Sequence, residues 1–151
     1  MRLYLPATLD ELDDPAGELP ARRAHAVTAA LRAALPDEDD EGLEFAAQLM
    51  AADDSLALIA DRPGAPRLRL VVSVDVVDTA VGAVDDADAA PSAVELLTAV
   101  SRDDIACAHV DEPEARDDVA RAAAGDEAAS DALDERDLLW YDATELGGIP
   151  R

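Results

Sequence analysis

Cys107 and His109 are the two residues whose types and spacing come closest to a chemical site. They lie two residues apart in the apolar run 105–110, so a strand there would point both side chains to one face. A thiolate beside an imidazole can form a nucleophile pair or supply two ligands to a metal ion. Zinc needs three or four ligands, and His25 is the only other histidine. A buried structural cysteine beside a histidine at a strand end is the simpler interpretation.

An aromatic run near residue 140 is the second candidate. Trp140 and Tyr141 are followed by Asp142 and Glu145, and two aromatic rings beside two carboxylates can line a pocket. The alternative is that Trp140 anchors this segment to the core. Large side chains are scarce in this chain, because aromatic residues make up only 3% of it. This scarcity favours the anchoring role.

The acidic stretch 37–42 begins like a calcium-binding loop. Carboxylates occupy positions 1, 3 and 5, and Gly42 occupies position 6, as in an EF-hand. The match then fails at two positions. Position 8 should be apolar and is Glu44, and position 12 should be a bidentate glutamate and is Gln48. An acidic helix start, which the helix dipole favours, explains the stretch without a metal ion.

No other motif indicates catalysis. With 35 acidic residues, neighbouring pairs such as Asp53 and Asp54 are unavoidable and do not indicate acid–base chemistry. Glycine-rich phosphate loops and a G-x-S-x-G elbow are absent, and the complete lack of lysine excludes Schiff-base chemistry. We therefore expect no cofactor, no metal and no catalytic residue.

The net charge of −23, with twelve arginines and no lysine, limits the partners. Codon usage in a GC-rich genome and adaptation to high salt both explain it, and codon usage is the simpler account. The field repels phosphate, and the only basic clusters are 22–23 and 67–69, so neither nucleic acid nor an anionic membrane is expected as a partner. Cys107 is the single cysteine, so no disulfide forms within the chain. With no apolar run of ~18 residues and no leader-like start, we expect a cytoplasmic protein.

Hydrophobic periodicity predicts the elements that position these residues. A strand at 2–6 leads to a helical turn at 9–12, an extended segment at 24–27 and a helix at 28–35. A longer helix follows the acidic stretch and ends at the Pro- and Gly-containing segment 61–66. Its apolar face is expected to hold Phe45, Leu49, Ala52, Leu56 and Ile59, with Glu44, Gln48 and Ser55 on the opposite face.

The second half of the chain is richer in strands. The strongest signal is at 68–76, where alternate residues are Leu or Val, and 94–100 is expected to pair with it. A third strand at 105–110 precedes a helix from 111 to about 124, and 138–142 is either a last strand, which propensity favours, or the start of a helix. Segments 78–91 and 125–137 are expected to be flexible acidic connections. The order predicts one α+β domain over 1–151, with an antiparallel or mixed sheet of four or five strands and about three helices, mainly on one face.

Five segments carry a resemblance to a known family. They are Met1 to Leu9, Ala24 to Thr28, Glu41 to Ala47, Ala108 to Asp111 and Leu138 to Tyr141. In these segments the chain resembles a family of small actinobacterial proteins of unknown function. The resemblance implies a bacterial cytoplasmic protein from a GC-rich genome, and it implies no activity and no site residues.

Two hypotheses for function follow. The first is a non-catalytic intracellular module that binds a basic protein partner, or that self-associates, because a large acidic field speeds such encounters. The alternative is a small enzyme or ligand-binding protein with a pocket built near His25, His109 and Trp140. The candidate ligand-binding residues are Tyr4, His25, His109, Trp140 and Tyr141. Convergence of His25 and His109 on one cavity would favour the alternative.

Overall fold

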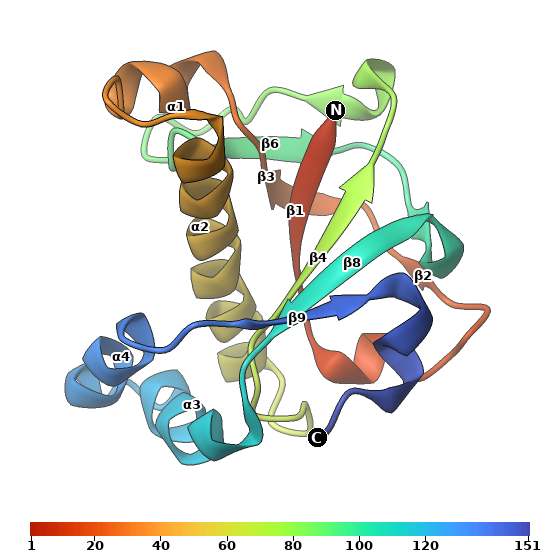
Figure 1. Ribbon diagram of the computed structural model, residues 1–151, viewed down its shortest axis with the longest axis vertical. Helices are drawn as coiled ribbons and strands as arrows, with labels where there is room; N and C mark the ends of the chain where they lie inside the picture. Colours follow the sequence, from red (N-terminus) through yellow and green to blue (C-terminus); the bar gives the residue numbers. More distant parts are fainter.

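The computed structural model describes residues 1–151 and contains a seven-stranded sheet, a two-stranded sheet and four α-helices (Figure 1). The predicted α+β class is confirmed, but the large sheet has more than the four or five strands predicted, and there are four α-helices rather than three. Strands of two residues carry too little sequence to show a period-2 pattern, so they escape prediction. None of the helices has the length and apolarity needed to cross a bilayer.

The strands are β1 (Arg2–Ala7), β2 (Glu18–Leu19), β3 (Arg22–His25), β4 (Leu70–Asp75), β5 (Val81–Gly82), β6 (Ala93–Leu96), β7 (Val100–Ser101), β8 (Ile105–Val110) and β9 (Leu139–Asp142). The α-helices are α1 (Ala29–Ala34), α2 (Asp40–Asp61), α3 (Arg116–Ala123) and α4 (Glu127–Asp134), and the 3-10 helices are η1 (Leu9–Leu12), η2 (Asp78–Ala80), η3 (Arg102–Asp104), η4 (Pro113–Ala115) and η5 (Ala143–Gly148).

The large sheet is antiparallel throughout, in the order β5-β6-β3-β1-β4-β8-β9. The predicted pairing of segment 94–100 with β4 is wrong. β6 pairs with β3 and β5, and β7 pairs with β2 in the small sheet. β4 has no edge to offer, because β1 and β8 occupy both of its sides.

One face of the large sheet carries the main core. Leu70, Val72 and Val74 alternate on β4 as predicted and are fully buried, in one cluster with Leu3 and Leu5 of β1. η1, the small sheet and η5 cover this face, on the side away from α2 in Figure 1. Their buried contributions are Leu9, Leu12, Leu19, Val100, Leu146 and Ile149.

α2 lies against the opposite face of the sheet, but with a different side inward than the sequence predicts. Leu43, Ala47 and Ala51 are buried in one cluster with Tyr4 and Val71 of the sheet. Alanine side chains let the helix backbone approach the strands closely, and close approach fills the layer without large side chains. The side of α2 that packs on the sheet is therefore not centred on the predicted apolar face, of which only Ala52 belongs to this cluster.

Ser55, predicted on the exposed face of this helix, is fully buried. Its hydroxyl donates to the Ala7 carbonyl at 2.7 Å and accepts from the Leu70 amide at 3.0 Å. Ala7 and Leu70 are cross-strand partners on β1 and β4. Ser55 therefore joins α2 to the ends of both central strands.

The apolar stripe predicted for α2 exists, but only its C-terminal half is covered. Ile59 is buried in one cluster with the α3–α4 hairpin, and Leu56 is partly buried against the same cluster. Phe45 and Leu49 remain 52% and 42% exposed. The stripe therefore extends beyond the elements of this chain that pack against it, and the prediction of Phe45 and Leu49 as core residues is wrong.

Segment 125–137 contains helix α4, so its prediction as a connection is wrong. Asp126 caps this helix by accepting from the Ala129 amide, and Gly125, with φ of +96°, forms the turn between α3 and α4. Ala129 and Leu133 are buried beside Val119 of α3. The α3–α4 interface consists mainly of small side chains. An alanine-rich sequence can form it without the pattern of large apolar residues that usually predicts a helix. Segment 78–91 contains η2 and β5, and residues 139–142 form a strand, as propensity favoured.

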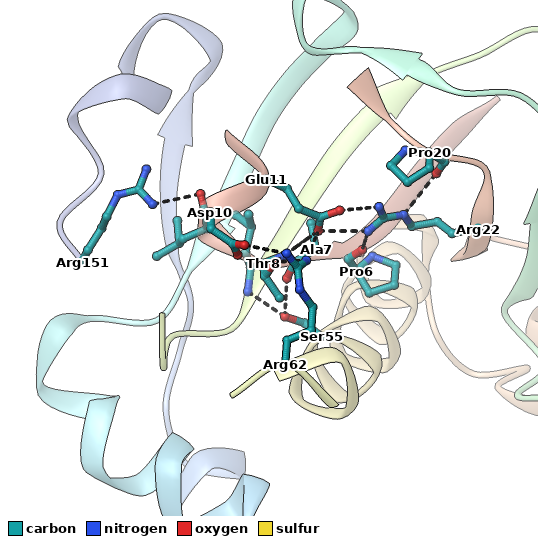
Figure 2. A network of polar contacts seen from close by, with 12 residues as sticks. Pro6, Ala7, Thr8, Asp10, Glu11, Pro20, Arg22, Ser55, Arg62 and Arg151 are labelled. Atoms are coloured by element: carbon teal, nitrogen blue, oxygen red, sulfur yellow. Dashed lines mark hydrogen bonds and ion pairs between the residues drawn. The ribbon is translucent and has the colours of Figure 1, made fainter. Parts of the chain in front are cut away.

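A polar network joins η1, β3 and the end of α2 (Figure 2). The Glu11 carboxylate accepts from the Thr8 amide at 2.9 Å and from Arg22 at 2.5 Å. Arg62, just beyond α2, donates to the Thr8 hydroxyl at 2.9 Å and to Asp10 at 2.6 Å. Burial alone would raise the pKa of Glu11, but the Arg22 and Thr8 hydrogen bonds outweigh it and hold this pKa below its usual value.

Candidate functional site

Strand register brings several of the scarce residues onto the face of the sheet that α2 only partly covers. Direct cross-strand partners point to the same face of a sheet. Tyr4 of β1 lies opposite Ser73 of β4, and Ser73 lies opposite Cys107 of β8. In the neighbouring row, His109 of β8 lies opposite Trp140 of β9. These five side chains therefore share one face, as the i, i+2 spacing of Cys107 and His109 predicts.

A hollow of about 250 Å³ lies where these strands meet the N-terminal half of α2. We call it the α2–β9 hollow. Tyr4, Ser73, Cys107 and His109 line it from the sheet, and Phe45 and Trp140 line it from α2 and β9. Trp140 is 59% exposed, so it borders solvent and does not anchor the core as the simpler interpretation predicted.

Two carboxylates from α2, Glu41 and Glu44, border the same hollow. Neither makes an ion pair, as is the case for most of the 35 acidic residues of the chain. Arg2 also lines the hollow, but its Nε and Nη2 each donate a hydrogen bond of 2.8 Å to the Asp75 carboxylate. The hollow therefore has two uncompensated negative charges and no uncompensated positive charge.

Tyr4 and His109 in the hollow are both uncharged near pH 7. Burial, together with the nearby Glu44 carboxylate, raises the pKa of Tyr4 to about 12, so its hydroxyl keeps its proton. Burial lowers the pKa of His109 below its ordinary 6.5, so the imidazole is uncharged. A neutral imidazole has one ring nitrogen that can accept a hydrogen bond.

Two buried polar atoms of the hollow have no hydrogen-bond partner. These are the hydroxyl of Ser73, a residue that is 1% exposed, and Nδ1 of His109. Buried polar groups are almost always paired in folded proteins, and each exception calls for an explanation. Because Ser73 Oγ and His109 Nδ1 are not bonded to one another, the pair is not arranged as a nucleophile and its base. The arrangement is suited to holding a ligand.

His25 lies away from this hollow. Its ring nitrogens are bonded to Ser92 at 2.8 Å and to Asp54 at 3.0 Å, beneath α2. His25 lies on β3 and His109 on β8, with β1 and β4 between them, so roughly 14 Å of sheet separates them. Both face the same side of the sheet but do not share a cavity, and the pocket hypothesised around His25, His109 and Trp140 is not formed.

The His25 contacts resemble a serine–histidine–aspartate chain, but Ser92 is fully buried. A nucleophile must reach its substrate, and the buried Ser92 hydroxyl does not. These hydrogen bonds therefore link β3 and α2 without exposing a reactive oxygen. Tyr141, another predicted site residue, packs against the main core on the other face of the sheet. The structure thus brings together Tyr4, His109 and Trp140, and it excludes His25 and Tyr141 from the hollow.

No three His, Cys, Asp or Glu side chains are placed to hold a metal ion. The acidic stretch that resembled a calcium loop is the start of α2. Asp39 caps this helix, with its carboxylate accepting from the Gly42 amide at 2.9 Å, and helical structure begins at Asp40. Cys107 is a free thiol beside His109, without a further ligand.

A larger cavity, of about 460 Å³, lies on the other side of α2 beside the polar network of Figure 2. Arg22, Arg23 and Arg62 line it, and each is already paired with a carboxylate of the chain. Its polar groups therefore have partners, whereas Ser73 and His109 in the α2–β9 hollow have none. We regard the smaller hollow as the candidate site for this reason.

Sequence reasoning missed the residues that α2 contributes to the hollow, among them Glu44 and Phe45, and it also missed Ser73 of β4. Ser73 stands on the polar face of the predicted strand 68–76, and pairing that strand with 2–6 and 105–110 would have placed it between Tyr4 and Cys107. Phe45 was predicted on the apolar face of the helix, a position typical of a core residue. No signal in the sequence shows that the α3–α4 hairpin, which covers the C-terminal half of α2, does not reach Phe45.

Comparison with family models gives a match over residues 1–149, to a family described as a family of unknown function, DUF6912. The chain belongs to this family. A search of curated proteins and a search of solved structures each gave no match. The resemblance noted from the sequence is therefore confirmed at the level of a family of unknown function, and the functional assignment depends on the geometry of the site.

Proposed function

We propose that the chain is a binding protein without catalytic activity, which docks a basic segment of a partner protein on the surface formed by α2 and β9. The observation that carries this proposal is the uncovered end of the α2 stripe. Phe45, Leu49 and Met50 are exposed on the helix, and Phe45 and Trp140 border the same hollow. Neighbouring exposed apolar side chains of this size are characteristic of interaction sites.

The charge around this surface selects a basic occupant. The chain has a net charge of −23, and Glu41 and Glu44 at the hollow have no ion-pair partner. The arginines beside the surface, Arg2, Arg69 and Arg136, are each paired with carboxylates of the chain. A basic segment with apolar side chains would meet an apolar centre and an acidic rim, the arrangement typical of tight contacts.

Self-association on the same surface is disfavoured by the same charge. Two copies would bring two fields of −23 together, with acidic rims facing each other. A basic partner neutralises this field, and the long-range attraction accelerates its arrival. A dimer whose stability rises steeply with salt would favour self-association instead.

We place this interaction in the cytoplasm, in an actinobacterial cell as the resemblance suggests. The single cysteine supports this setting, because it is a free thiol and reduced thiols are the rule in the cytosol.

Selection from a random peptide library, with the folded chain as bait, tests the proposal. We expect enriched peptides to combine Arg or Lys with aromatic or aliphatic residues, and their affinity to fall as salt is added. The double variant Phe45→Ser, Trp140→Ser should weaken binding by about 30-fold or more, the effect of losing one hot-spot contact.

Leu97→Ser is the matched control, because Leu97 is 55% exposed but follows β6, near the far edge of the sheet. Its affinity should equal that of the original chain. Enriched peptides that lack basic residues, or that bind the double variant unchanged, would contradict the proposal.

A further inference from the structure

The unpaired polar atoms of the α2–β9 hollow specify its ligand more closely than charge alone. Ser73 Oγ and His109 Nδ1 are buried without partners, and their residues line a hollow that two exposed aromatic rings, Phe45 and Trp140, also line. Both atoms can accept a hydrogen bond, and Tyr4 lines the same hollow. An occupant that donates several hydrogen bonds would satisfy both atoms at once.

Two aromatic rings, Phe45 and Trp140, stand among the mainly polar residues that line the hollow. Phe45 and Trp140 approach from opposite elements, α2 and β9, and each presents roughly half of its surface to solvent. Aromatic faces attract cations, and a planar guanidinium stacks on them better than a compact ammonium does. Glu41 and Glu44 add two charges that no group of the chain neutralises.

We propose that the α2–β9 hollow binds the guanidinium of an arginine side chain from the partner. This inference rests on the docking function proposed above and names the residue that the hollow accepts. A guanidinium carries five N–H donors in one plane, which suits acceptors at the floor, carboxylates at one rim and aromatic faces at the sides. A lysine ammonium offers three donors around a point and gains less from stacking on an aromatic ring. The volume of about 250 Å³ is smaller than a typical small-molecule pocket and suits one side chain.

Trp140 makes the test direct, because it is the only tryptophan of the chain and lines the hollow. Its fluorescence can be followed while N-acetyl-arginine-methylamide is added to the full chain. The matched probes are the lysine and citrulline analogues, of which citrulline keeps the shape of arginine and lacks the charge. We expect saturable quenching by the arginine probe, and at least about tenfold weaker binding of either analogue, since hydrogen bonds to charged groups contribute that much.

Variants of the hollow separate this inference from general acidity. Ser73→Ala and Glu44→Gln should each lower the affinity for the arginine probe by about three- to tenfold, whereas Leu97→Ser should leave this affinity unchanged. Ser73→Ala removes a buried hydroxyl that has no partner, so the variant should fold with unchanged or higher Tm.

Equal affinity for the lysine and arginine probes would overturn the guanidinium assignment and leave basic docking standing. Arginine binding that survives in both Ser73→Ala and Glu44→Gln would place the ligand elsewhere and also overturn it. The absence of any basic peptide from the library selection would remove the docking function itself. Quenching by citrulline as strong as by arginine would show an uncharged ligand and contradict both proposals.

Discussion

Replacing Ser55 by alanine tests which side of α2 faces the sheet, because the two orientations predict effects of opposite sign. On an exposed helix surface this change would stabilise the protein by up to about 0.5 kcal/mol, since alanine is the better helix former. In the structure it leaves the Ala7 carbonyl and the Leu70 amide buried without the hydroxyl that bonds both. An unsatisfied buried group costs about 1–3 kcal/mol. The two groups are cross-strand partners and can re-pair in part, so we expect a loss of about 2–4 kcal/mol.

Urea unfolding at neutral pH measures this loss. With an m-value of about 1–3 kcal/mol/M, the midpoint should fall by about 1–2 M while m stays unchanged. Ser130→Ala, in α4, is the matched control. Its hydroxyl donates only to the carbonyl four residues before it, so the free energy of unfolding should change by less than about 0.5 kcal/mol. A Ser55→Ala protein as stable as the original would refute the observed orientation of α2.

Three further perturbations test the packing and the electrostatics. Asp111→Asn leaves the buried Arg69 guanidinium without its carboxylate partner and should cost about 3–5 kcal/mol in urea unfolding, while adding Arg69→Met should recover much of that loss. Because burial lowers the pKa of His109 in the folded state, the stability linked to it is present above pH 6.5 and falls as the pH drops further; His109→Gln should flatten this decline in urea midpoints, and an unchanged slope would contradict the shift. Gly125→Ala forces a side chain onto a residue with φ of +96° and should lower stability by about 1–2 kcal/mol, whereas Gly64→Ala, where nothing lies within contact distance, should change it by less than about 0.5 kcal/mol in the same assay.

The large strands were predictable because their apolar side chains are large and alternate. Segment 68–76 shows this pattern, and β4 has the predicted faces. The orientation of α2 was not predictable in the same way, because the helix has two apolar stripes. One contains Phe45 and Leu49, and the other contains Ala47 and Ala51. Side-chain size favours the first stripe, but the close layer between helix and sheet accepts the second, and periodicity alone does not measure that distance.

Part of the site followed from the scarcity of its residues. Tyr4, His109 and Trp140 were singled out because the chain has few aromatic residues and histidines, and the strand register places all three at one hollow. His25 was singled out for the same reason, but Asp54 and Ser92 hold it beneath α2. Composition therefore finds unusual side chains, and only the order of the strands decides which of them meet.

Because the hollow is built from strands far apart in the chain, the strand order decides how late in synthesis the hollow is completed. β4 follows β1 only after the whole of α2, and β9 is the last strand to be made. At about 5–20 residues per second, the ribosome needs roughly 3–13 s to pass from the end of β4 to the end of β9. A nascent chain in that interval has the floor of the hollow at Tyr4 and Ser73, but it does not yet have Trp140. Incomplete chains therefore lack the complete surface on which we propose that a partner docks.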